Sequence, residues 1–214
     1  MHQACQAQFR VRKGQTLFED EEDSVSVFHV QRNFGAGWED VLQLSLESGR
    51  SWGDRIDLLY RHKTTSELLL HVEGFGYWGD FEFYQSMDCG LTWNPITQPG
   101  FGIAHDIAPP AILDFLVFNT RLYASTGRGD GPGQIWRSLD GINWAPMIIH
   151  GFNDPDNVDV TAMAAYNGVI YAGVTNLVSG AQIWSSFTGD SNSWIQAPPP
   201  TAAELTTLGF TIFD

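Results

Sequence analysis

The chain has few basic residues, and this scarcity excludes two classes of partner. Its 214 residues include 11 lysines and arginines against 25 aspartates and glutamates, for a formal net charge of −14. Neither lysine nor arginine occurs after Arg137. Nucleic-acid phosphates and anionic membrane surfaces would repel such a protein, so we expect no nucleic acid and no membrane as a partner. We interpret the excess acids as solubilising surface charge.

The chain also has few cysteines, and it contains neither long apolar runs nor helical periodicity. Cys5 and Cys89 are its two cysteines, which is too few to identify a redox compartment. No stretch resembles a transmembrane span, and residues 1–4 show no signal peptide, so localisation stays unassigned. Glycine and aromatic residues are abundant instead, at 22 glycines and 13% aromatic residues. Short alternating runs between turn residues predict an all-β protein.

Four segments begin with a serine and end with a tryptophan. They are residues 45–52 (box 1), 86–93 (box 2), 138–144 (box 3) and 186–194 (box 4), and their tryptophans stand 41, 51 and 50 residues apart. A repeat at this period indicates one supersecondary unit used several times. Strands expected around the boxes correspond between units, since Tyr171 follows Tyr123 by 48 residues. His29 and His71 are also interpreted as equivalent positions, which favours packing over metal binding.

These units predict a β-propeller, or an open arc of one. Each unit supplies four short strands joined by hairpins such as Asn167-Gly168, which disfavours a parallel β-helix. Stacking four-stranded antiparallel blades around an axis buries both faces of each sheet. We expect one repeat domain over residues 1–214, with blades at about 7–55, 56–98, 110–150 and 160–198. Residues 205–214 would be the first strand of a further blade or a ring-closing strand. Three arrangements are therefore expected as alternatives: a fragment of a larger propeller, a small closed ring, or an open arc that can form a homo-oligomer.

The boxes resemble the Asp-box, or bacterial neuraminidase repeat, of the sialidase-like superfamily. The family pattern is S-x-D-x-G-x-S/T-W, and box 2 matches it at every defined position. Box 1 has Glu47 in place of the aspartate, box 3 is one residue shorter, and box 4 is one longer and degenerate. The resemblance covers about residues 7–214 and implies a turn between the third and fourth strands of each blade.

The box residues are expected to be structural and not catalytic. Serine hydroxyls and aspartate carboxylates bond the backbone N–H groups of turns, glycine supplies positive φ, and tryptophan covers the turn. The residues assigned this role are Ser45, Glu47, Trp52, Ser86, Asp88, Gly90, Trp93, Ser138, Asp140, Gly141, Trp144, Ser186 and Trp194.

Ligand contacts are expected in the loops at one end of the blades. Aromatic side chains in glycine-rich loops can stack on sugar rings while neighbouring polar groups bond hydroxyls. The alternative is that these aromatics pack under their own loops. The candidates are Trp38, Tyr77, Trp78, Asp80, His105, Asp106, Arg128 and Asp130. Asp154, Asp156 and Asp159 form an oxygen-rich loop that is a weak Ca²⁺ candidate, so no metal and no cofactor is predicted.

The sequence predicts a non-catalytic binding or scaffold module that takes a glycan or protein ligand. The alternative is a sialidase-like glycoside hydrolase, or a fragment of one. That family needs three arginines, and its first lies in an N-terminal motif that Phe9 to Arg12 resembles without the expected proline. With no arginine after Arg137, the later members have no evident place, and no catalytic residue is assigned. A third hypothesis is a protein-interaction platform, like the Asp-box propellers of photosystem assembly or sorting receptors.

Overall fold

The structure is a computed structural model, and the described residues are 7–18, 23–49, 55–61, 68–73, 81–96, 101, 111–127 and 131–198. These residues divide into two compact units. Unit 1 comprises residues 1–112 together with 138–145, and unit 2 comprises residues 113–137 together with 146–214. We describe each unit by itself.

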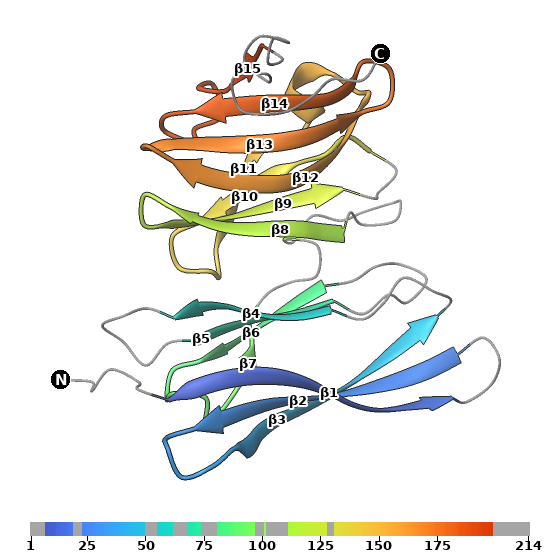
Figure 1. The fold of residues 1–214 in the computed structure, drawn as a ribbon, viewed down its shortest axis with the longest axis vertical. Helices are drawn as coiled ribbons and strands as arrows, with labels where there is room; N and C mark the ends of the chain where they lie inside the picture. The colour runs from blue at the N-terminus through green and yellow to red at the C-terminus, as the bar shows by residue number, and fades with distance from the viewer. Residues whose placement is uncertain are drawn as a thin grey trace, which may run out of the picture. The chain divides into compact units, whose positions relative to one another are not determined.

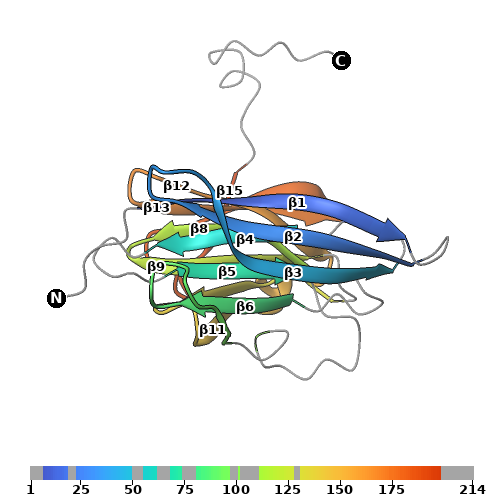
Figure 2. The ribbon, with the colours of Figure 1, turned by 90° about the horizontal axis from the view of Figure 1, so that it is seen from below.

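Sheet 1 is a three-stranded antiparallel meander at the start of unit 1. Its strands are β1 (Gln8–Phe18), β2 (Asp23–Asn33) and β3 (Glu39–Gly49). Figure 2 shows the three strands lying side by side. The pairing of β2 with β3 shifts by one residue between Val30 and Gln31, so that Gln31 lies opposite Asp40. This irregularity decides which β3 side chains share a face with β2.

Sheet 2 completes the strands of unit 1. Its four strands run in the order β4 (Arg55–Arg61), β5 (Leu68–Glu73), β6 (Phe81–Ser86) and β7 (Asn94–Pro95). Neighbouring strands are antiparallel, with Leu70 opposite both Leu58 and Tyr84. Box 2 is the turn between the third and fourth of these strands.

Sheets 3 and 4 repeat the four-stranded meander. Sheet 3 contains β8 (Ala111–Phe118), β9 (Arg121–Gly127), β10 (Ile135–Ser138) and β11 (Trp144–Ile148). Sheet 4 contains β12 (Asn157–Tyr166), β13 (Val169–Asn176), β14 (Gly180–Ser186) and β15 (Ile195–Ala197). A 3₁₀ turn, η2 (Gly151–Asn153), precedes β12. Figure 1 shows β12 to β14 arranged as consecutive neighbours.

Two-residue turns explain why the first hairpin of sheets 3 and 4 forms. Asn119 and Thr120 have φ of 48° and 61°, and Asn167 and Gly168 have φ of 48° and 74°. Positive φ at both central residues is the geometry of a type I′ turn, which matches the twist of the flanking strands. In sheet 4 the pair Tyr166 and Val169 directly closes this turn.

The core of unit 1 lies between sheets 1 and 2. Val30, Leu70 and Val72 are buried together, with partly buried side chains of both sheets around them. On the opposite side of sheet 2, Phe83 is fully buried and stacks on Trp144 with ring centroids 5.4 Å apart. Burial of large aromatic rings of this kind is a main source of stability in small all-β units.

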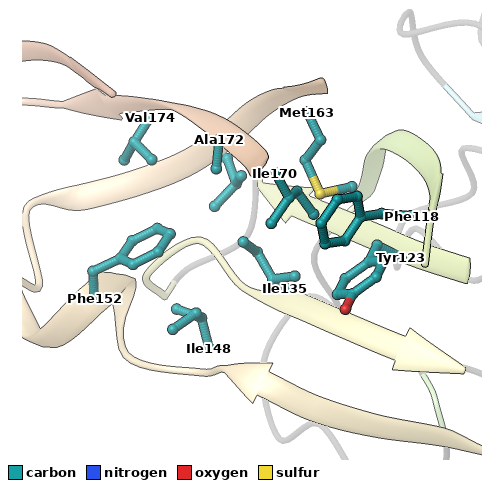
Figure 3. Close-up of a cluster of buried hydrophobic side chains, with 10 residues drawn as sticks. Phe118, Tyr123, Ile135, Ile148, Phe152, Met163, Ile170, Ala172 and Val174 are labelled. Atoms are coloured by element: carbon teal, nitrogen blue, oxygen red, sulfur yellow. The ribbon is translucent and has the colours of Figure 1, made fainter. Parts of the chain in front are cut away.

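The core of unit 2 lies between sheets 3 and 4. Figure 3 shows Ile170, Ala172 and Val174 of β13 pointing toward Ile135 and the neighbouring rings. The whole buried cluster contains Phe118, Tyr123, Ile135, Ile148, Phe152, Val160, Met163, Ile170, Ala172 and Val174. Burial alternates along β13, as expected for a strand with one face on the core.

The all-β prediction is confirmed by four antiparallel sheets, and no α-helix occurs in the described residues. Two sequence expectations differ from the structure. Sheet 1 has three strands in its described part where four were expected. His29 and His71 are not equivalent, because His29 pairs with Gln43, two residues before Ser45, whereas His71 pairs with Phe83, three before Ser86. Because side chains alternate between the two faces of a strand, this one-residue offset puts the two rings in different environments. His29 is partly exposed, and His71 is fully buried beside Phe83.

No helix among the residues that the structure places has the length and apolar character needed to cross a membrane.

Candidate functional site

Of the eight predicted ligand-contacting residues, Trp38 lies in the described structure. Its side chain is 38% exposed in the loop between β2 and β3. The remaining candidates lie outside the described residues; they are Tyr77, Trp78, Asp80, His105, Asp106, Arg128 and Asp130. Among the box residues, Trp52 also lies outside them. The candidate site is therefore built around Trp38.

The loop that carries Trp38 is shaped by Asn33. The side-chain Oδ1 of Asn33 accepts hydrogen bonds from the backbone N–H groups of Gly35 at 2.6 Å and Gly37 at 3.2 Å. Both glycines have positive φ, at 105° and 130°, which side chains with a Cβ rarely adopt. An asparagine that bonds the backbone two residues on is an Asx turn, so the sequence N-x-G-x-G folds the loop locally.

A row of polar side chains crosses the outer face of sheet 1 beside Trp38. Arg10, Gln31 and Asp40 are direct cross-strand partners on β1, β2 and β3. The Nε–H of Arg10 donates to Gln31 Oε1 at 2.6 Å, and Gln31 Nε2 donates to Asp40 Oδ1 at 2.6 Å. The Arg10 guanidinium lies 4.1 Å from the centroid of the Trp38 ring. This cation–π contact ties the exposed indole to the polar row.

The carboxylate of Asp40 ends the row and also meets His29. His29 Nδ1 and Asp40 Oδ2 lie 2.9 Å apart. The hydrogen bond from Gln31 lowers the pKa of Asp40; partial desolvation opposes this, and the nearby His29 and Arg12 lower the pKa further. Asp40 is therefore an anion in neutral solution. The Arg12 guanidinium is the nearby cation, and the Gln31 amide donates a hydrogen bond to the Asp40 carboxylate.

The opposite face of sheet 1 carries a separate ion pair that anchors the sheet. Arg32 donates from Nε and Nη2 to Glu39 Oε1 at 2.9 and 2.6 Å. Its Nη1 donates to the carbonyl oxygen of Cys89 at 3.1 Å, within box 2. Cys89 is disulfide-bonded, and the chain's other cysteine, Cys5, lies outside the described residues. We assign this buried arginine to structure, because its donors are used within unit 1.

The outer face of sheet 1 has the chemistry of a binding surface. It offers an exposed indole, a guanidinium and a carboxylate within a few strand spacings, while the buried Gln31 amide joins the two charged groups. Such a set can stack on an apolar ring face and exchange hydrogen bonds with hydroxyl groups. The row was missed from the sequence, although the alternation of polar residues along β2, with His29 and Gln31 on one face, was the available signal.

The oxygen-rich loop serves a turn in the structure. Asp154 Oδ1 accepts from the backbone N–H of Asp156 at 3.0 Å, and Oδ2 accepts from the Asn176 amide at 2.9 Å. Asp159 is partly buried beside Gly127. In the part of the chain that the structure describes, no group of three or more His, Cys, Asp or Glu side chains is placed to hold a metal ion.

Box 2 is held by its serine and aspartate. Ser86 Oγ accepts from the N–H of Gly90 at 2.8 Å and donates to Asp88 Oδ1 at 2.8 Å. The same carboxylate oxygen accepts from the N–H groups of Leu91 and Thr92 at 3.0 and 2.9 Å, and Oδ2 accepts from the Thr92 hydroxyl at 2.6 Å. These bonds satisfy the backbone donors of a tight turn, so both side chains are occupied by structure.

Box 3 repeats this arrangement with one residue fewer. Ser138 Oγ accepts from the N–H of Gly141 at 2.8 Å. Asp140 Oδ1 accepts from Ile142 and Asn143 N–H groups at 2.9 and 2.8 Å, and the indole N–H of Trp144 donates to the Gly141 carbonyl at 3.1 Å. Burial opposes ionisation of the Asp140 carboxyl, but these hydrogen bonds and those from the Asn143 amide and Ser138 outweigh it and lower its pKa to about 2.

Box 4 keeps the serine and loses the aspartate. Ser186 Oγ accepts from Gly189 N–H at 2.8 Å, while Thr188 occupies the position that Asp88 and Asp140 hold. Asp190 instead forms an ion pair with Arg137, Nη1 to Oδ1 at 2.6 Å, and this hydrogen bond is the main cause of its lowered pKa. The degenerate box is thus tied to β10 of the preceding sheet.

The glycine of each described box lies close against an apolar or aromatic side chain. A Cβ added to Gly90 would lie 2.7 Å from Phe9 Cε1, and one added to Gly141 would lie 2.7 Å from Leu69 Cδ2. A Cβ on Gly189 would collide with the ring of Tyr123, at 2.8 Å from Cζ. In each case the partner belongs to the sheet before the one that carries the box. The box glycines are therefore required by space as well as by positive φ.

Replacing Asp140 with asparagine is expected to make stability less dependent on acid pH. The folded pKa of about 2 lies below the ordinary value of 3.8, so the carboxylate stabilises the fold fully above 3.8 and loses that effect as pH falls through 2. Discounted for solvent exposure, the contribution is about 1 kcal/mol. Urea unfolding at pH 6, 4 and 2.5 should show the gap between wild type and Asp140→Asn shrinking with acid. An equal gap at pH 6 and 2.5 would contradict this role.

Comparisons with known proteins give distant structural likenesses. No family model and no curated protein matches the chain in sequence. A Dyadobacter fermentans protein of unknown function aligns with 88% of this chain and 69% of its own, at 15% identity and a TM-score of 0.42. An α-L-arabinofuranosidase from Clostridium thermocellum aligns with 88% and 71%, at 11% identity and 0.42. A Trypanosoma rangeli sialidase in complex with sialic acid aligns with 88% and 38%, at 13% identity and 0.38. These likenesses are too distant to assign the chain an activity.

Proposed function

We propose that this chain is a non-catalytic binding module made of propeller-type blades with Asp-box turns, and that its ligand is a glycan. The proposal rests on the outer face of sheet 1, where the exposed Trp38 adjoins Arg10, Gln31 and Asp40. Three of the four sheets are four-stranded meanders, and boxes 2 and 3 use their serine and aspartate as turn clasps, which supports the blade reading.

The chemistry of the row favours a neutral, hydroxyl-rich ligand. The cation of Arg10 and the anion of Asp40 are joined through Gln31, so the row as a whole carries little net charge toward a ligand. Vicinal hydroxyl groups both donate and accept hydrogen bonds, which matches a guanidinium donor and a carboxylate acceptor on one face. Stacking of a sugar ring on the indole would supply the apolar contact.

Removing the indole is expected to weaken glycan binding by about fivefold or more. A glycan array with purified protein would identify a binding sugar, and calorimetry would compare wild type with Trp38→Ala and Trp38→Phe. Loss of the ring removes stacking worth about 1 kcal/mol and frees Arg10 from its platform, whereas phenylalanine keeps part of the stacking. Leu139→Ala, an exposed apolar residue of box 3, serves as the matched control and should bind as wild type does.

Three results would redirect the proposal. An array without hits, combined with a protein recovered by pull-down, would favour the protein-ligand reading. Hydrolysis of a fluorogenic sialoside that Arg10→Ala abolishes would instead support the hydrolase alternative. Unchanged sugar affinity in Trp38→Ala would place the binding site elsewhere.

A further inference from the structure

Two neighbouring rows on the outer face of sheet 4 contain no charged side chain. Ala164, Tyr171, Ser185 and Ile195 are cross-strand partners and form one row across all four strands. The next row passes through Gly173 and Ile183 in the same way. None of these positions carries a charge, although the chain has a net charge of −14. An uncharged face on so acidic a protein is unusual for a surface that only meets water.

Three large side chains on this face are exposed, among smaller residues such as Ala164 and Gly173. Tyr166 is 69% exposed, Ile195 63% and Ile183 47%. From strand spacing and rise per residue, the face measures roughly 300–400 Å² in plan. The comparable position on sheet 3 behaves differently: Tyr123, 48 residues before Tyr171, is fully buried in the core of unit 2. In sheet 3 this side of the meander is buried. We therefore expect the same side of sheet 4 to be suited to packing against another protein surface.

We infer that the outer face of sheet 4 docks on the same face of a second copy of this chain, forming a two-fold symmetric dimer. Uncharged rows pack on uncharged rows in this arrangement, as between the sheets of a β-sandwich. The outer face of sheet 1 is a poor complement. Placing Arg10 and Asp40 against Ile183 would take both charges out of water with no new partner. The contrast in polarity therefore favours self-pairing over a head-to-tail contact.

The size of the face sets the expected affinity. A specific interface usually buries about 800 Å² of accessible surface on each partner, and this face is about half that size. We therefore expect a reversible dimer with a Kd on the order of 10–100 µM. Because each copy carries a net charge of −14, repulsion opposes association, and added salt should tighten the dimer by screening it.

Sedimentation equilibrium of the 214-residue chain, from about 5 to about 500 µM, tests the inference. Wild type is expected to pass from monomer to dimer, and more readily in 0.5 M than in 0.05 M NaCl. Ile183→Glu should weaken the dimer by at least a hundredfold, because a two-fold interface contains the substitution twice. Ile195→Glu on the edge strand is the second disruptive variant. Leu139→Glu, 74% exposed on box 3 and not part of sheet 4, is the matched control and should dimerise as wild type does.

Circular dichroism and the melting temperature would show that each variant is folded before its mass is interpreted. A wild-type chain that stays monomeric over the whole range would overturn the inference. A dimer that both glutamate variants preserve, or one that salt dissociates, would overturn it as well, because the contact would then lie elsewhere or be ionic.

Discussion

Replacing Trp93 with alanine is expected to lower the free energy of unfolding by about 3–5 kcal/mol. The ring ends box 2 and packs against the buried Val30, Leu70 and Val72 between sheets 1 and 2. Truncating a large aromatic side chain removes apolar contact and leaves a cavity, and both effects destabilise. Urea or thermal unfolding followed by circular dichroism would measure the change.

Two further variants identify the cause of that loss. Met87→Ala, in the same box but with an exposed side chain, should change stability by less than about 0.5 kcal/mol. The indole N–H of Trp93 is buried and donates to no acceptor within the described residues. Trp93→Phe should therefore retain much of the stability, because the ring and not a hydrogen bond is what packs. A melting temperature that hardly moves in Trp93→Ala would show that the ring does not hold the sheets together.

Replacing Gly189 with alanine is expected to destabilise unit 2 by about 2–5 kcal/mol. Its φ of 73° costs a residue with a Cβ about 1–2 kcal/mol. The added methyl group would also collide with the fully buried ring of Tyr123, and such overpacking costs about 1–3 kcal/mol. The two costs act together because the turn cannot shift without releasing Ser186, whose hydroxyl accepts from the Gly189 N–H.

Gly168→Ala is the matched control for this substitution. Gly168 has nearly the same φ, 74°, but no atom lies within 4 Å of a Cβ placed there. Its replacement should therefore cost about 1 kcal/mol, from backbone strain alone. The difference between the two variants isolates the contact with Tyr123. Equal losses would mean that box 4 does not press on the preceding sheet.

The sequence was sufficient to predict features that depend on residues close together along the chain. Alternating residues between turn signals predicted strands, and Asn167-Gly168 predicted a hairpin that has the expected positive φ. The hydrogen bonds of Ser86 and Asp88 also follow from local chemistry, since each partner lies within four residues. Features of this kind depend on one turn or one strand, and no distant contact is needed to define them.

Positions that depend on strand register were not predictable in the same way. The interpretation of His29 and His71 as equivalents failed because a shift of one residue exchanges the two faces of a strand. Similarly, Asp40 lies opposite Gln31 only because the pairing shifts between Val30 and Gln31. Without that irregularity Val41 would occupy this place, and the row from Arg10 would end in an apolar side chain.

The amino-acid order by itself determined an acidic, all-β chain of repeated meanders with serine-bonded turns, because alternation and turn chemistry act between neighbours along the chain. Tertiary structure alone decided that Trp38 meets Arg10, that the Tyr123 ring lies against Gly189, and that Ile183 of sheet 4 is exposed. These outcomes join residues far apart in sequence, and they depend on the register of the strands and the packing of one sheet on the next.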